Sequence, residues 1–129
     1  MKKCLILIVL FCGVQYLSSQ VFKFRAHSIS IYNNKLDNWK PFEETHLLIS
    51  VNLDKSRVSI YSKEVQIFDI IKIDDQTTDK NGDILFKFHI EDAKGEICNL
   101  DYVEVKNGTK LLYIRYPNLQ YVYAIEQVE

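Results

Sequence analysis

The stretch that decides the fold runs from His46 to Asp74 and reads HLLISVNLDKSRVSIYSKEVQIFDIIKID. Apolar residues recur in it at every second position, which is the period of a strand with one buried face. The polar breaks at 54–56 and 62–64 are too short for anything but hairpin turns. Three strands joined by hairpins form an antiparallel meander, because parallel neighbours need a long crossover. The residues expected to share the apolar faces are Leu47, Ile49, Val51, Leu53, Val58, Ile60, Val65, Ile67 and Ile71.

The same alternation continues on both sides of this stretch and predicts five more strands. They cover residues 21–32, 84–91, 96–105, 111–116 and 119–125. The apolar residues change face near His27-Ser28 and again between Tyr102 and Val103, so we expect a β-bulge at each place. Asn107-Gly108 is expected to form a type I′ hairpin turn, which needs positive φ angles at both central residues.

About eight strands with hairpin connections, and no helical period, indicate an all-β fold built as a small antiparallel meander. We prefer an up-and-down, lipocalin-like barrel to a two-sheet sandwich, because closing the sheet removes its exposed edges. Barrels of the lipocalin kind carry a tryptophan near the first strand, after a glycine. Here Trp39 follows Asp37-Asn38 instead, so the similarity covers one residue and implies no ligand site.

Residues 1–19 have the pattern of a secretory signal peptide: a basic start, a short apolar run and an exit of small residues. We expect cleavage near Ser19-Gln20, which leaves residues 20–129 as a single all-β domain, secreted or periplasmic. The leader resembles those of exported bacterial proteins. A lipoprotein anchored at Cys12 is one alternative, but Leu10-Phe11 stand where that signal needs small residues. An uncleaved anchor is a further alternative.

Removal of Lys2 and Lys3 leaves fourteen basic against seventeen acidic residues, a net charge near −3. The charges are interspersed, so no basic stripe follows a nucleic-acid backbone and no polybasic patch meets anionic lipid. The apolar run of the leader is too short to span a bilayer, and we expect no integral membrane span in the mature chain.

Cys98 is the one cysteine that remains after cleavage, so the mature chain cannot form an internal disulfide. It alternates with Leu100 and Tyr102, which favours a buried residue that packs as a small hydrophobe. A disulfide between two chains is the alternative.

Residues 33–45, NNKLDNWKPFEET, form the least regular segment. Asn33-Asn34 signals a turn, and Pro41 argues against a central strand position. Trp39 and Phe42 are large for a loop, and we expect them to fold back as a lid over one end of the core. The alternative is that the two rings form an exposed recognition patch.

No sequence motif for catalysis is present, and we expect the protein not to be an enzyme. His27, His46 and His89 are isolated, with no pair at metal-ligand spacing, and no cofactor is expected. Acidic residues crowd the loop from Asp74 to Asp83, where calcium binding is an alternative to a solvated hairpin loop.

These patterns predict a small exported binding module for a small apolar ligand or a surface partner. The alternative is a structural or accessory cell-envelope protein that acts only through protein–protein contacts. A narrow barrel is often filled by its own side chains, and Phe22, Phe24, Phe86 and Phe88 could fill this one. Tyrosine is enriched at recognition surfaces. The candidate ligand-binding residues are Trp39, Phe42, Phe86, Tyr113, Tyr121 and Tyr123.

Overall fold

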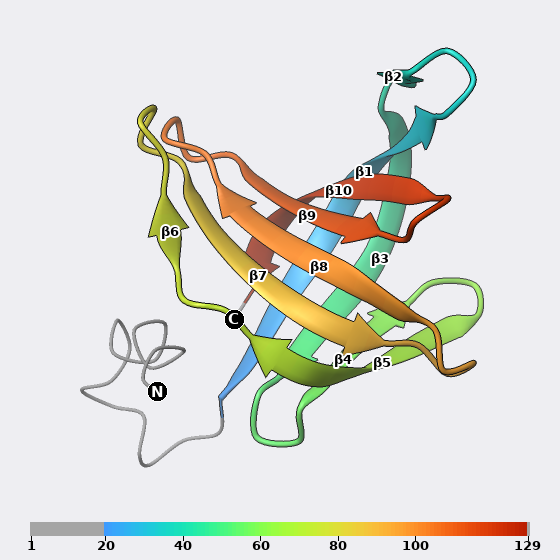
Figure 1. Ribbon diagram of the computed structural model, residues 1–129, viewed down its shortest axis with the longest axis vertical. Coiled ribbons are helices and arrows are strands. Elements are labelled where there is room, and N and C mark those ends of the chain that lie inside the picture. The colour runs from blue at the N-terminus through green and yellow to red at the C-terminus, as the bar shows by residue number, and fades with distance from the viewer. Residues whose placement is uncertain (1–19, 129) are drawn as a thin grey trace.

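The computed structural model describes residues 20–128, so the expected signal peptide and Cys12 lie outside the described residues. This part of the chain forms ten strands and no helix (Figure 1). The strands are β1 (Val21–Asn33), β2 (Asn38–Trp39), β3 (Glu43–Asn52), β4 (Arg57–Tyr61), β5 (Val65–Ile73), β6 (Thr77–Thr78), β7 (Ile84–Glu91), β8 (Ile97–Glu104), β9 (Lys110–Arg115) and β10 (Gln120–Val128). Over these residues, nothing helical offers the length and apolar character of a membrane span.

Eight of these strands close into an up-and-down barrel, in the order β1, β3, β4, β5, β7, β8, β9 and β10. The closing seam joins β10 to β1, from Lys23 opposite Val128 to Ile31 opposite Tyr121. All the neighbouring pairs are antiparallel. The barrel predicted from the alternating pattern is therefore confirmed, and the two-sheet sandwich is excluded by the closing seam.

The core is the barrel interior, filled by residues at alternate positions of every barrel strand. Its most deeply buried large side chains include Phe68, Ile49, Ile60, Ile90, Leu100, Leu112 and Ile114. Cys98 is 4% exposed and belongs to the same cluster, so the predicted buried cysteine is confirmed.

Two β-bulges adjust which residues face inward. The first lies between Ala26 and Ser28 in β1, where the sequence predicts one. The second lies between Ile70 and Lys72 in β5. The bulge expected between Tyr102 and Val103 is wrong, because β8 pairs with both neighbours without a break and Val103 simply points outward.

The expected inward face of β5 is also wrong. Val65, Ile67 and Ile71 are 55%, 36% and 54% exposed and lie on the outer wall. Phe68 is 1% exposed and packs in the core with Ile70 against it. Both faces of this strand are apolar, and the face that carries the largest ring is the one that fills the barrel.

Three hairpins of the C-terminal half use the same turn. In each, a glycine donates its N–H to the carbonyl three residues earlier, as Gly108 does to Val105 at 2.8 Å. Gly82, Gly95 and Gly108 have φ angles of +91°, +86° and +97°. The type I′ turn expected at Asn107-Gly108 is wrong, because Asn107 is not among the residues with positive φ. A three-residue loop that ends in a left-handed glycine replaces it.

The segments expected to be loops contain two short extra strands. β2 pairs with the end of β1, through Trp39 opposite Tyr32, and projects beyond the barrel (Figure 1). β6 lies within the polar segment after Asp74 and pairs with the start of β7, through Thr77 opposite Leu85.

Candidate functional site

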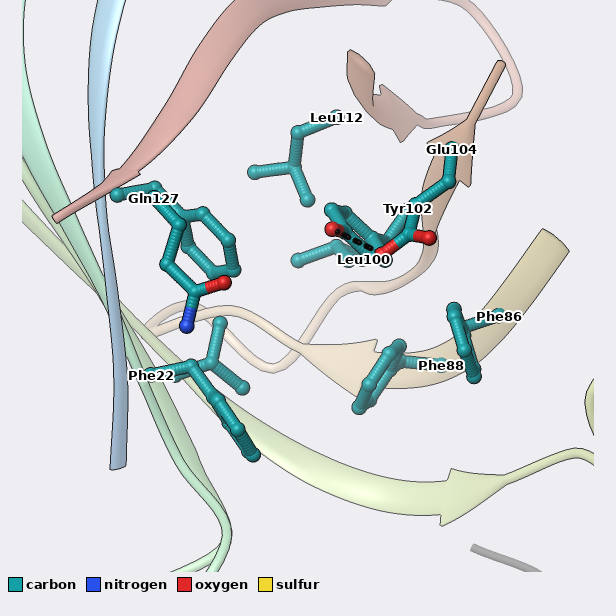
Figure 2. A pocket seen from close by; sticks show the side chains of 10 residues that line it. Phe22, Phe86, Phe88, Leu100, Tyr102, Glu104, Leu112 and Gln127 are labelled. Carbon is teal, nitrogen blue, oxygen red and sulfur yellow. Dashed lines mark hydrogen bonds between the residues drawn. The ribbon is translucent and has the colours of Figure 1, made fainter. Parts of the chain in front are cut away.

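A small gap opens inside the barrel at the end where β1 begins and β10 ends. Its volume is about 60 Å³. Side chains from β1, β3, β7, β8, β9 and β10 surround it (Figure 2). They are Phe22, Phe24, Val51, Phe86, Phe88, Leu100, Tyr102, Glu104, Leu112 and Gln127. The sequence places them there because each occupies an inward position of its strand.

Aromatic rings form the walls of this gap. The ring of Tyr102 lies 5.5 Å from that of Phe24 and stacks on that of Phe86 at 5.6 Å, measured between centroids. Phe22 and Gln127 stand across the gap from Phe86 and Phe88 (Figure 2). Offset aromatic pairs of this kind stabilise the wall beyond their buried area.

One hydrogen-bonded pair brings polarity to the gap. The Tyr102 hydroxyl donates to Glu104 Oε2 at 2.8 Å (Figure 2). Burial, followed by this bond to the carboxylate, raises the pKa of Tyr102 far above its ordinary value, so the phenol stays neutral. The pair can therefore hold the polar end of a guest while the rings cover its apolar part.

The volume limits what this gap can hold. A water molecule takes about 30 Å³ in the liquid, and an engineered cavity of about 150 Å³ accepts benzene. Pockets for drug-sized ligands span roughly 300–1,000 Å³. A gap of about 60 Å³ therefore admits only a short, slender apolar group without movement of its walls.

The opposite end of the barrel carries a group of tyrosines. The rings of Tyr121 and Tyr123 meet edge to face at 5.6 Å, and the Tyr121 hydroxyl donates to Gln66 Oε1 at 3.4 Å. The Tyr116 hydroxyl donates to Asp92 Oδ2 at 2.8 Å. Burial is the main cause of raised pKa values here, to about 12 for Tyr123. Tyr116 and Tyr121 act as neutral donors at this end of the core, where Tyr123 packs.

Cys98 lies in this tyrosine-rich end. Burial raises the pKa of its thiol to about 11. A thiol with such a pKa is protonated at neutral pH, and the thiolate is the reactive form. Cys98 therefore packs as a small hydrophobe whose buried thiol stays protonated at neutral pH.

Trp39 lies on the outer wall of the barrel and does not cover the core. Its ring meets Tyr32 at 5.3 Å and Tyr113 at 5.8 Å, both edge to face. Tyr113 points outward, because its neighbours Leu112 and Ile114 fill the core. Trp39 is 37% exposed, and the lid expected from Trp39 and Phe42 is wrong because neither ring lies over the core.

The six candidate ligand residues lie in four separate parts of the structure. Phe86 lines the gap, Tyr121 and Tyr123 pair at the far end, and Trp39 and Tyr113 meet on the outer wall. Phe42 is 51% exposed. The six therefore do not form one site.

Part of the gap was not predicted as a binding site. Phe22 and Phe86 line the gap, as expected for a cavity, whereas Phe24 and Phe88 were expected only to fill the barrel, and Tyr102 and Glu104 were not among the candidate residues. Tyr102 and Glu104 do follow a sequence pattern, because they continue the alternation of inward-facing residues that Cys98 and Leu100 begin along β8.

The acidic loop uses its carboxylates locally. Asp79 Oδ1 accepts the N–H groups of Asn81 and Asp83, at 2.8 and 3.0 Å. Asp74 contacts His89 Nε2 with both oxygens at 3.1 Å, and this hydrogen bond lowers the pKa of the Asp74 carboxyl. Within residues 20–128, no three side chains of His, Cys, Asp or Glu gather closely enough to hold a metal ion.

No protein-family model matches the chain, and no curated protein or solved structure is significantly similar to it.

Proposed function

We propose that this protein is a non-enzymatic binding module whose open barrel end takes the apolar part of a small ligand. The observation that carries the proposal is the gap of about 60 Å³, walled by aromatic rings and provided with one hydroxyl–carboxylate pair. Apolar walls with a few placed polar groups are the usual composition of a ligand site.

The size of the gap narrows the ligand class. A fused ring system exceeds the space, whereas the end of an unbranched alkyl chain fits it in cross-section. The remainder of such a chain would leave through the rim, past Phe22 and Gln127. Its polar end group would meet Tyr102 and Glu104 there.

The experiment is a titration of the purified protein with unbranched alcohols from butanol to octanol, followed by amide chemical shifts. We expect saturable shifts at Phe22, Phe86 and Tyr102, with affinity that rises with chain length as more apolar surface is buried. Benzyl alcohol is the matched bulky control and should bind more weakly. Shifts that never saturate, or that spread over the outer wall, would contradict the proposal.

A second measurement uses protein purified from its native host. Native mass spectrometry should show an added apolar mass if the gap is occupied in the cell. A bare polypeptide mass would count against a resident ligand.

An alternative function is that of a structural or accessory envelope protein that acts through protein contacts. It is favoured by four exposed apolar residues that lie side by side on the outer wall of β3, β4 and β5: Leu48, Tyr61, Val65 and Ile67. A photo-crosslinking residue at position 61 should then capture one abundant envelope partner, and capture of none would dismiss this reading.

We also propose that the protein is exported and that its signal peptide is removed. β1 begins at Val21, directly after the expected cleavage near Ser19-Gln20, and the Gln20 backbone nitrogen donates to Asp54 Oδ2 at 3.0 Å. A new N-terminus at Gln20 would keep this attraction. N-terminal sequencing of the secreted or periplasmic protein should begin at Gln20; an intact Met1 would refute processing.

A further inference from the structure

A second concave site lies on the outer wall of the barrel, separate from the interior gap. It is a groove of about 250 Å³ formed by β7, β8 and β9 together with the segment that contains β6. It is lined by Thr77, Asp79, Asp83, Leu85, Asp101, Val103, Tyr113 and Arg115. The groove shares no lining residue with the gap.

Asp101 is the buried residue of this groove. It is only 5% exposed although it points away from the core. Its Oδ2 accepts a hydrogen bond from Arg115 Nε at 2.9 Å, whereas its buried Oδ1 accepts none from the described residues. A buried carboxylate oxygen without a donor is costly, so native proteins rarely keep one without a reason. This oxygen is an acceptor that the fold itself leaves unsatisfied.

The charges of the groove do not balance. Three carboxylates line it, from Asp79, Asp83 and Asp101, against the single guanidinium of Arg115. Lys87 is the cross-strand neighbour of Asp101, yet no ion pair within 4.0 Å joins the two in the described part of the chain. The formal charge of the lining is therefore −2, which calls for a guest with two positive charges.

The spacing of the carboxylates decides against a metal. Asp79 and Asp83 each hold backbone N–H groups with Oδ1, Asp83 that of Lys106 at 3.0 Å, and these bonds fix them at the rim. They do not converge with Asp101 into a metal-binding group among residues 20–128. An extended organic cation can reach separated acceptors, because its N–H donors are distributed along its length.

Tyr113 adds an aromatic surface that is compatible with such a cation. The guanidinium of Arg115 already lies 4.3 Å from the centroid of this ring. One face of the ring therefore already holds a cation of the chain itself, and a guest cation can meet only the ring surface that Arg115 and Trp39 leave open.

We propose that this outer groove binds a small linear organic dication whose N–H donors reach Asp101 and the rim carboxylates. An alkyl guanidinium with a terminal amine, or a linear diamine, has the required charge and donor pattern. This site is independent of the apolar gap, so either proposal can fail without the other.

The probe for this groove is agmatine, which carries a guanidinium at one end and an ammonium at the other. We expect a saturable one-to-one heat by calorimetry, weakened by added salt because the attraction is electrostatic. Amide shifts should map to Thr77, Val103 and Tyr113. Butylguanidine, a monocation that keeps the guanidinium and the four-carbon chain but lacks the ammonium, should bind roughly tenfold more weakly, because one charge-assisted contact is lost.

Two isosteric variants test the residues. Asp101→Asn and Asp79→Asn each keep an oxygen acceptor and should weaken agmatine binding roughly tenfold or more. Asp69→Asn, an exposed change on β5 outside the groove, is the matched control and should bind like the unchanged protein. Circular dichroism of each variant confirms that it is folded.

Three results would overturn the proposal: agmatine that gives no saturable heat, both isosteric variants binding as well as the unchanged protein, or shifts that map to Phe22 and Phe86. Calcium that binds one-to-one and displaces agmatine would also overturn it, by making the groove a metal site.

Discussion

Replacement of Val51 by isoleucine tests whether the barrel gap is free space. Val51 lines the gap and is 6% exposed. Isoleucine keeps the β-branch that suits a strand and adds one methylene. The gap of about 60 Å³ has room for this group, so the methylene is buried without displacing its neighbours.

The expected gain follows from the area buried. One methylene removed from water contributes about 0.8 kcal/mol to the free energy of unfolding. For a domain of this size that is a rise of roughly 3 °C in the unfolding midpoint. The assay is thermal unfolding followed by circular dichroism, with urea unfolding to give the free energy.

Val58→Ile is the matched control. Val58 lies on β4 opposite Val51, is 0% exposed and does not line the gap. The same methylene there overpacks a filled core, which typically costs about 1–3 kcal/mol. If Val51→Ile lowers the midpoint as much as Val58→Ile does, the gap is not usable space and the size argument for a ligand fails.

Two further predictions concern pH and a turn. Burial raises the pKa of Cys98 from 9.0 to about 11, so the folded state holds this proton more tightly than the unfolded chain does. Cys98 alone should therefore lower the stability by up to about 3 kcal/mol as pH rises from 9 to 11, and the buried tyrosines add to this loss above pH 10. Urea unfolding at several pH values should show a shallower loss for Cys98→Ala between pH 9 and 10, and equal slopes would contradict this cause. Gly108→Ala should cost about 1–2 kcal/mol, because φ is +97° and no atom lies within 4 Å of an added Cβ, so the whole cost is backbone strain. Gly108→Asn should cost less, since asparagine tolerates this conformation, and equal losses for both variants would argue against strain.

The sequence predicted the barrel and its first bulge because those features are local. Ala26 and Ile29 have opposite parity within one apolar strand, and only an extra residue lets both face inward. The hairpin at Gly95 likewise follows from its own residues, since a left-handed position favours glycine.

The inward face of β5 could not be predicted in the same way. Val65 and Ile67 are as apolar as Ile70, so parity alone does not choose between the faces. The choice depends on the fit of the Phe68 ring among side chains from other strands, which is a property of the closed barrel.

The candidate sites depend even more on long-range register. Trp39 meets Tyr113 only because the segment after β1 folds onto the outer wall of β9. Glu104 reaches the gap because β8 runs to its end without a bulge. Neither relation is visible within a window of ten residues.

The seam between β1 and β10 has a consequence for how the protein is made. Of the described strands, β1 leaves the ribosome first and pairs with β10, which leaves last. The edge of β1 that pairs with β10 therefore stays unpaired until nearly the entire chain has been made. During that interval an unpaired strand edge is open to strands of other molecules, which is a route to aggregation. Circular permutation would only move this seam, because opening the hairpin at Gly108 would make β9 the first strand and β8 the last, and these two also pair. Yield of soluble protein, rather than final stability, is therefore the property that late closure of the barrel puts at risk.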